Sequence, residues 1–150
     1  MSVAIKELIR QHHSADNCLA QCHAALNRAE PAVAAQHFSQ FDSELRAHIR
    51  LEEERLFPAF EQATGNLSGP TMVMRTEHVD MLALCGEIHA QLAQVSAGNA
   101  QALLARLGTV LEQHSLKEET VLYPMCAARI NDLSGVLGMG SGCCGACSCG

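Results

Sequence analysis

The stretches HIRLEEERLFP, at residues 48–58, and HSLKEETVLYP, at residues 114–124, carry one pattern twice. Each has a histidine, three residues, a Glu-Glu pair, two further residues, an apolar pair and a proline, and the second stretch starts 66 positions after the first. On a helix, residues four apart lie about 40° apart around the axis, so each His and its first Glu can face the same point. We therefore expect two inward-facing His-Glu pairs on two helices.

The composition supports a helical protein of one main domain. The chain has 150 residues, of which 48% are hydrophobic but only 3% aromatic, and tryptophan is absent. A core built from Leu, Ala, Val, Ile and Met favours helices over a β-sandwich. The net charge of −6, without a cluster of Lys and Arg, argues against a nucleic-acid or membrane partner.

The start of the chain and its cysteines bear on the cellular compartment. Residues 1–13, MSVAIKELIRQHH, become polar too early for a signal peptide, and no apolar run approaches the length of a membrane span. We expect a soluble, cytoplasmic protein. Free thiols or metal thiolates are then favoured over disulfides for the eight cysteines.

The spacing of apolar residues predicts four helices with short connections. They cover roughly residues 3–28, 31–63, the segment from the loop at 64–70 to about 96, and 100–130. This order predicts an antiparallel up-down-up-down four-helix bundle with a pseudo-twofold repeat, as a domain of residues 1–130. Pro58 and Pro124 are expected to kink or end their helices. Residues 131–150, rich in Gly, Ser and Cys, are predicted to form a flexible tail.

Six residues are candidate metal ligands. The offset of 66 residues that relates His48 and Glu52 to His114 and Glu118 also relates His12 to His78. A buried carboxylate costs several kcal/mol unless a charge such as a metal ion neutralises it. Four imidazoles and two carboxylates at the middle of a bundle describe a dinuclear site, better suited to iron or manganese than to structural zinc.

His13 is an alternative to His12 as a ligand. Relative to the apolar stripe of the first helix, His13 points about 100° away. We therefore prefer His12.

These residues and the paired stretches resemble the hemerythrin-like (HHE cation-binding) domains over roughly residues 5–130. The resemblance implies two iron ions, joined by oxo and carboxylate bridges, in a four-helix bundle; manganese and zinc are alternatives. By position, Glu52 and Glu118 would bridge the irons. The other implied ligands are His12, His48, His78 and His114.

The chain departs from the oxygen-carrying hemerythrins at two positions. Their third helix carries His-x-x-x-His, but here Met74 stands four before His78. Their fourth helix has an Asp five after its His, whereas this chain has Glu118 four after His114. With one imidazole fewer, coordination positions open for small molecules, and the pattern resembles more closely the di-iron proteins of iron–sulfur repair and nitric-oxide stress. Those proteins usually carry an amino-terminal cysteine-bearing segment, which this chain lacks.

A second level of polar residues is predicted about 16 Å along the bundle. It contains His23, His37 and His89, and Glu44 and Cys85 fall between it and the main site. Three readings stay open: a second metal site, a wet access path, or an open bundle end that meets water. Glu53, Glu77 and Glu119 adjoin proposed ligands, where they can either accept hydrogen bonds from imidazoles or lie at the surface.

The cysteine-rich end has several interpretations. The thiols of this end can bind Cu(I) or Zn, carry redox equivalents, or have no role. They are Cys143, Cys144, Cys147 and Cys149.

The expected function is handling of O2, NO, peroxide or labile iron in redox stress or iron-centre repair. The alternatives are reversible binding or sensing of O2 or NO, and metal storage or trafficking. We assign no catalytic residue and no protein partner.

Overall fold

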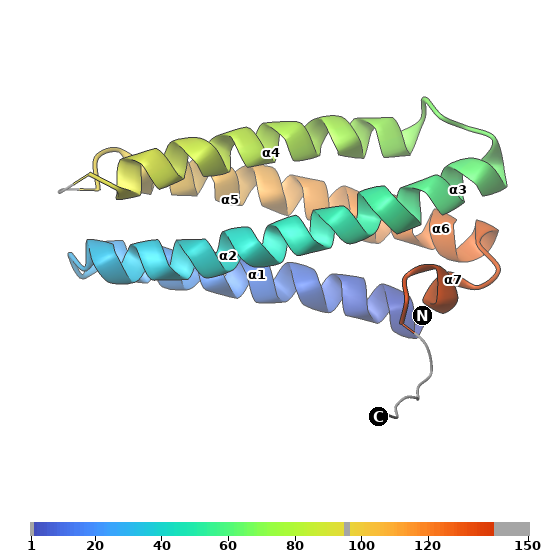
Figure 1. Cartoon of the computed structure of the whole chain (residues 1–150), viewed down its shortest axis with the longest axis horizontal. Helices are drawn as coiled ribbons and strands as arrows, with labels where there is room; N and C mark the ends of the chain where they lie inside the picture. Colours follow the sequence, from blue (N-terminus) through green and yellow to red (C-terminus); the bar gives the residue numbers. More distant parts are fainter. Residues whose placement is uncertain (1, 95–96, 140–150) are drawn as a thin grey trace.

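The computed structural model describes residues 2–94 and 97–139, and every regular element in these ranges is helical (Figure 1). The predicted tail thiols lie outside the described residues. The elements are α1 (Val3–Asn27), α2 (Pro31–Leu51), η1 (Glu52–Leu56), α3 (Phe57–Thr64), α4 (Pro70–Leu92), α5 (Ala100–Lys117), η2 (Glu118–Leu122), α6 (Tyr123–Arg129) and α7 (Leu133–Val136). None of the helices described is both long and apolar enough to span a membrane.

Local chemistry explains where these helices start and end. The Ser2 hydroxyl accepts a hydrogen bond from the Ile5 N–H at 3.1 Å, which satisfies one free donor at the start of α1. Pro31 and Pro70 open α2 and α4, where the missing N–H costs nothing. Gly65 ends α3 with a φ of 70°, a left-handed conformation that glycine adopts without strain.

The helices form a bundle. Helix α1 packs along α2 and α4 along α5, while α2 also contacts α4 and α1 contacts α5 (Figure 1). The connections between neighbouring helices are short, as predicted from the sequence. The prediction of an all-helical bundle is therefore confirmed.

The predicted breaks at Pro58 and Pro124 take an unexpected form. The helical path does not end at either proline; each proline follows a five-residue π-helical segment, η1 or η2. Proline has no N–H and its ring crowds the carbonyl four residues earlier. Widening the preceding turn to i→i+5 hydrogen bonds lets the path continue.

The buried apolar residues form two clusters. Cluster 1 contains residues such as Leu19, Phe38, Met81 and Leu107, and cluster 2 contains others such as Leu8, Phe60, Leu122 and Tyr123. Along each long helical path, the candidate ligands stand near the point where the residues of one cluster are followed by those of the other. The metal site therefore lies in a polar layer between two apolar layers.

The packed structure extends past the predicted domain boundary at residue 130. Asp132 caps the short helix α7, accepting a hydrogen bond from the Gly135 N–H at 3.1 Å. Leu133 and Leu137 are buried in cluster 2. A Gly- and Ser-rich composition predicted a tail from residue 131 onward, but two well-placed leucines are enough to attach residues 131–139 to the end of the bundle.

Candidate metal centre

The six predicted ligands meet in the polar layer, and each is at most 7% exposed. Their ligand atoms form two groups of four, and within each group all atoms lie within 4.8 Å of one another. Site A consists of His12, His48, Glu52 and Glu118. Site B consists of His78, His114, Glu52 and Glu118. Each site thus offers two imidazole nitrogens and two carboxylate oxygens.

The two carboxylates belong to both sites. Glu52 Oε2 lies 3.2 Å from His48 Nε2, and Glu52 Oε1 lies 3.2 Å from His78 Nε2. Glu118 Oε1 lies 2.9 Å from His12 Nε2, and Glu118 Oε2 lies 3.2 Å from His114 Nε2. Each carboxylate therefore directs one oxygen to each site, the arrangement that a bridging ligand requires.

The π-helical segments explain how each bridging carboxylate shares a face with an aromatic ring. Phe57 N–H donates to the Glu52 carbonyl, and Tyr123 N–H donates to the Glu118 carbonyl, both across five residues. In an uninterrupted α-helix, residues five apart would lie about 140° apart around the axis. The wider turn brings both members of each pair inside, and all four are fully buried.

The half-buried side chains of Glu53 and Glu119 orient two imidazoles of the site. The Nδ1–H of His12 donates to Glu119 at 2.7 Å, and the Nδ1–H of His78 donates to Glu53 at 2.6 Å. A carboxylate can only accept, so each bond places a proton on Nδ1 and turns Nε2 toward Glu118 or Glu52, where this nitrogen can bind a metal once it carries no proton. The structure thus favours the hydrogen-bonding role of Glu53 and Glu119 over simple surface exposure.

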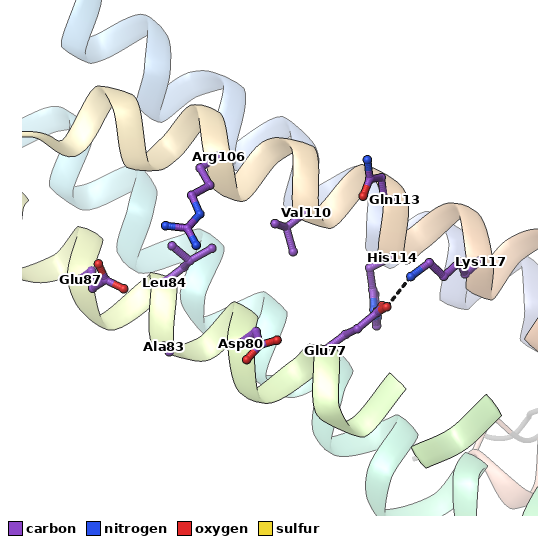
Figure 2. A pocket seen from close by; sticks show the side chains of 10 residues that line it. All are labelled: Glu77, Asp80, Ala83, Leu84, Glu87, Arg106, Val110, Gln113, His114 and Lys117. Atoms are coloured by element: carbon purple, nitrogen blue, oxygen red, sulfur yellow. Dashed lines mark hydrogen bonds and ion pairs between the residues drawn. The ribbon is translucent and has the colours of Figure 1, made fainter. Parts of the chain in front are cut away.

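The remaining two imidazoles have unlike partners. The Nδ1–H of His114 donates to Glu77 at 2.8 Å, and Glu77 also pairs with Lys117 (Figure 2). The Nδ1–H of His48 donates instead to the side-chain amide oxygen of Gln11 at 2.7 Å. Sequence analysis did not single out Gln11; its position 66 residues before Glu77 was the available signal.

Tyr123 is a further site residue that sequence analysis missed. Its hydroxyl donates to Glu52 Oε2 at 2.6 Å, and the same oxygen lies 3.1 Å from Glu118 Oε1. It also lies 3.2 Å from His12 Nε2 and 3.4 Å from His48 Nε2. The phenol therefore contacts every ligand atom of site A.

The buried charges of the site support one another. Burial opposes charge on His48, but the Glu52 and Glu118 carboxylates outweigh it and raise the pKa of His48 to about 10. Burial acts against ionisation of Glu118 as well, yet its close contacts with His114, His12 and His48 hold its pKa well below the usual value. Burial and the two carboxylates raise the pKa of Tyr123 well above 10. The positive charge of protonated imidazoles thus balances the negative charge of the carboxylates. A metal ion that displaces these protons can supply the same positive charge.

The donor atoms fit a metal ion. Among the described residues, four buried side-chain atoms form no regular hydrogen bond and lie only 3.2 Å from one another in His–Glu pairs, and all four face site B. They are Glu52 Oε1, His78 Nε2, His114 Nε2 and Glu118 Oε2. Buried polar atoms rarely lack a partner unless an ion or water serves them. Two imidazole nitrogens and two carboxylate oxygens suit a divalent or trivalent transition metal.

The alternative ligand His13 is exposed, and Met74 is buried in cluster 2. His12, which is buried at the site, is therefore the ligand candidate of α1. Met74 adds no ligand atom to the polar layer.

The second predicted level does not come together as a cluster. His23, His37 and His89 are half-buried, and among the described residues none of them joins a group able to hold a metal. His89 lies 3.4 Å from Asp42. Cluster 1 occupies the interior at this level, so the placement favours histidines that meet water over a second metal site.

The two residues predicted between the levels also lie apart. Glu44 accepts hydrogen bonds from Ser14 at 2.7 Å and Gln40 at 2.6 Å at the edge of α1 and α2. Cys85 is buried in cluster 1, where burial raises its pKa to about 12. These two side chains do not form a polar line through the core.

Two hollows adjoin the metal centre. A cavity of about 20 Å³ lies against all four histidines, and its wall includes Leu45, Met81 and Leu111. A groove of about 430 Å³ between α4 and α5 reaches the outer side of His114 (Figure 2). The inner cavity is small and mostly apolar, whereas the outer groove is open and carries charged side chains.

Comparison with known proteins identifies the family. The model of the hemerythrin HHE cation-binding domain matches residues 3–126, which is most of the chain. Searches of the curated proteins and of the solved structures gave no match. The matched range contains all six residues of the metal centre. The chain therefore belongs to the hemerythrin HHE cation-binding domain family, as its paired His-Glu stretches predicted.

Proposed function

We propose that this protein is a non-haem di-iron protein that binds O2, NO or peroxide and acts in redox stress or in repair of iron centres. In this proposal one iron occupies each of sites A and B. The ligands are the four histidines, and Glu52 and Glu118 bridge the irons. The relation to proteins of iron–sulfur repair is part of the proposal and rests on the ligand pattern.

The number of protein donors supports a reactive centre. Each site receives four donor atoms from the chain, and non-haem iron sites typically keep further coordination positions open for small molecules. A pair of iron ions held there would supply electrons and open coordination positions to a small molecule. The bridging carboxylates are buried and hydrogen-bonded, so their orientation is set before any ligand arrives.

The observation that carries the proposal is the cavity of about 20 Å³ beside all four histidines. A cavity needs about 10–15 Å³ to hold one water molecule, so this space suits water or a diatomic gas. Its apolar wall favours a neutral molecule over an ion. Larger organic substrates do not fit between the histidines and cluster 1.

The surrounding side chains have defined tasks in this proposal. Clusters 1 and 2 exclude bulk water from the polar layer. Glu53 and Glu119 fix the orientation and tautomer of His78 and His12 through hydrogen bonds to Nδ1. The Tyr123 hydroxyl is a buried proton donor within reach of Glu52 and of site A.

Metal analysis followed by exposure to gas tests the proposal. We expect anaerobically purified protein from iron-replete cells to contain two irons per chain. The reduced protein should then react with NO or O2, with changes in its visible and Mössbauer spectra. Protein that binds zinc alone, or no metal, would contradict the di-iron proposal. Iron-containing protein whose spectra ignore both gases would contradict the gas chemistry.

Reversible binding or sensing of O2 or NO is the second candidate function. The small, mostly apolar cavity favours it, since such a space can hold a neutral gas molecule beside the histidines. Stable spectra that return to the starting state when the gas is removed would support binding or sensing. Repeated consumption of the gas, or release of iron to a chelator under NO, would support the redox or repair role.

The architecture and the compartment form part of the same proposal. We infer that the four helical paths alternate in direction, up-down-up-down, and that a pseudo-twofold axis relates their halves. The short connections and the corresponding contacts of residues 66 apart support this order. The free buried thiols of the bundle fit a reducing, cytoplasmic location.

A further inference from the structure

The two halves of the metal centre differ at two positions. Residues 66 apart make matching contacts in most cases, as the bonds of His12 to Glu119 and of His78 to Glu53 show. Beside site A stands Tyr123, but Phe57 takes the corresponding place beside site B. The second difference is the outer partner of an imidazole, which is Gln11 for His48 and Glu77 for His114.

The aromatic pair occupies equivalent places with different chemistry. The Tyr123 ring stacks on His12 with centroids 5.7 Å apart, and the Phe57 ring stacks on His78 with centroids 5.8 Å apart. Both rings are fully buried. The difference within this aromatic pair is therefore a single hydroxyl group, placed at site A.

That hydroxyl engages the ligand atoms of site A. The Tyr123 oxygen lies between 2.6 and 3.4 Å from one atom of each of the four site A residues. An oxygen at hydrogen-bonding distance from four ligand atoms stands in the region where a metal bound by those atoms would sit. A metal entering site A must displace this phenol or accept its oxygen as a ligand.

Site B presents the opposite situation. Its four ligand atoms are buried, and among the described residues their polar contacts are only with one another: His78 Nε2 lies 3.2 Å from Glu52 Oε1, and His114 Nε2 lies 3.2 Å from Glu118 Oε2, in a geometry that forms no regular hydrogen bond. A metal that binds there replaces these poorly aligned contacts, and no described side chain other than the four ligands has to move away. The phenyl ring of Phe57 offers no polar atom that could compete.

The outer partners of the imidazoles add to the difference. At site B, His114 donates to the Glu77 carboxylate, and His78 donates to Glu53. At site A, His48 donates to the neutral amide oxygen of Gln11. A carboxylate partner makes an imidazole more basic than an amide partner does, so site B should bind a cation more strongly.

We propose that the two metal positions are unequal, and that site B binds the first metal ion while site A fills second because the Tyr123 hydroxyl occupies its ligands. The inference rests on the proposed metal centre but needs neither iron chemistry nor a gas. Tyr123 is thus a specificity-determining residue that separates the affinities of two otherwise similar sites.

Titration of the metal-free full chain with Co(II) under anaerobic conditions tests the order of binding. Co(II) serves as the probe because its visible spectrum reports binding without a redox step. We expect two binding steps that differ at least tenfold in affinity. His48→Ala should remove the weaker step, and His114→Ala should remove the tighter one, which assigns each step to its site.

The aromatic pair provides matched variants. Tyr123→Phe should strengthen the second step at least tenfold and bring it close to the first. Phe57→Tyr places a hydroxyl at the other site and should weaken the first step. Circular dichroism and thermal unfolding check that each variant is folded, and Mössbauer spectra at one ⁵⁷Fe per chain provide a second measurement. We expect one iron environment in the original chain and two in Tyr123→Phe.

The outcomes separate this inference from the proposed function. Two steps of equal affinity in the original chain, or an unchanged second step in Tyr123→Phe, would overturn the inference and leave the metal centre intact. Removal of the tighter step by His48→Ala would also overturn it. Absence of binding of both Co(II) and iron would overturn the proposed metal centre itself.

Discussion

At the scale of single residues, the site depends on hydrogen bonds made outside the ligand atoms. Each imidazole directs Nε2 to the centre because Nδ1 donates outward to a carboxylate or an amide. Such partners typically change metal affinity by about 10–100-fold when they are removed. The affinity of this centre should therefore respond to residues that never touch the metal.

Glu77→Gln is the most direct test of this dependence. The variant gives His114 an amide partner, the same chemistry that Gln11 already provides to His48. We expect a loss of about tenfold in affinity at site B, with the helical content unchanged. Metal titration measures the effect. Lys117→Met is the control, because it removes the other partner of Glu77 but leaves the bond to His114 in place.

Glu118→Ala tests the bridging role. Because Glu118 directs one oxygen to each site, its loss should weaken both sites and leave less than one metal per chain. The two apolar clusters remain, so the chain should keep most of its helical content. Metal analysis and circular dichroism give the two readouts. A variant with full metal content and unchanged spectra would rule out Glu118 as a bridge.

At the scale of helices, the π-helical segments decide which side chains meet at the site. The expected kinks at Pro58 and Pro124 are wider turns, and these turns bring Phe57 and Tyr123 over the ligands. The six ligands could be predicted because histidine and glutamate on an apolar stripe are unusual. The place of Tyr123 in the site could not be predicted. It depends on the wider π-helical turn before this residue, and a pattern analysis that assumes 3.6 residues per turn does not detect such a turn.

The helices also bury thiols, and this gives a dependence on pH. Burial raises the pKa of Cys22 to about 11 and those of Cys85 and Cys126 to about 12, from an ordinary value of 9. A raised thiol pKa means that the folded state holds its proton more tightly. The resulting stability is complete below pH 9 and is lost as the pH rises through 11 to 12.

We therefore expect the free energy of unfolding to fall between pH 9 and pH 11 in urea titrations. Cys85→Ala should lower the stability at pH 7 by leaving a small cavity, but it should reduce the slope above pH 9. His48 loses its own stabilising proton as the pH rises toward 10 in metal-free protein. Comparing the variant with the original chain cancels that contribution. An equal slope in both proteins would contradict the assignment to the thiol.

At the scale of the whole molecule, the polar layer is held between two apolar clusters, one of which α7 completes. The four long helical paths and their connections could be predicted from apolar spacing, prolines and loop composition. Helix α7 could not be predicted, because four residues are too few to show a helical period. Its attachment to the bundle depends on the contact of Leu133 and Leu137 with cluster 2, which only the folded structure shows. Family membership followed from the repeated stretches alone.

Leu133→Ala tests the contribution of α7 to the stability of the bundle. The side chain is 6% exposed, and truncation of a buried leucine costs about 2 kcal/mol or more. Chemical unfolding measures the change. Leu116→Ala on α5 is the matched control, because Leu116 is 59% exposed and its truncation should cost less than about 0.5 kcal/mol. Equal effects of the two variants would mean that α7 does not support the bundle.

Metal binding should stabilise the entire fold. The four buried ligand atoms of site B form no regular hydrogen bond without a metal, and metal that binds only the folded state raises the free energy of unfolding. We expect a higher melting temperature with Co(II), and a smaller rise in His114→Ala. Addition of a chelator should reverse the rise. A melting temperature that does not change on addition of Co(II) would exclude tight binding of the metal to the native state.

The sharing of Glu52 and Glu118 between the sites has a consequence for the smallest unit that can build this centre. Neither half of the chain supplies all four ligands of a metal site, since each site takes one carboxylate from the other half. A fragment that stops at the loop before α4 carries one bridging carboxylate and two imidazoles, which is half of the ligand set of the dinuclear centre. Two copies of that fragment, brought together around a twofold axis, would supply six ligands. Because the loop joins the two halves, assembly of the centre is an intramolecular folding step and requires no association of two molecules.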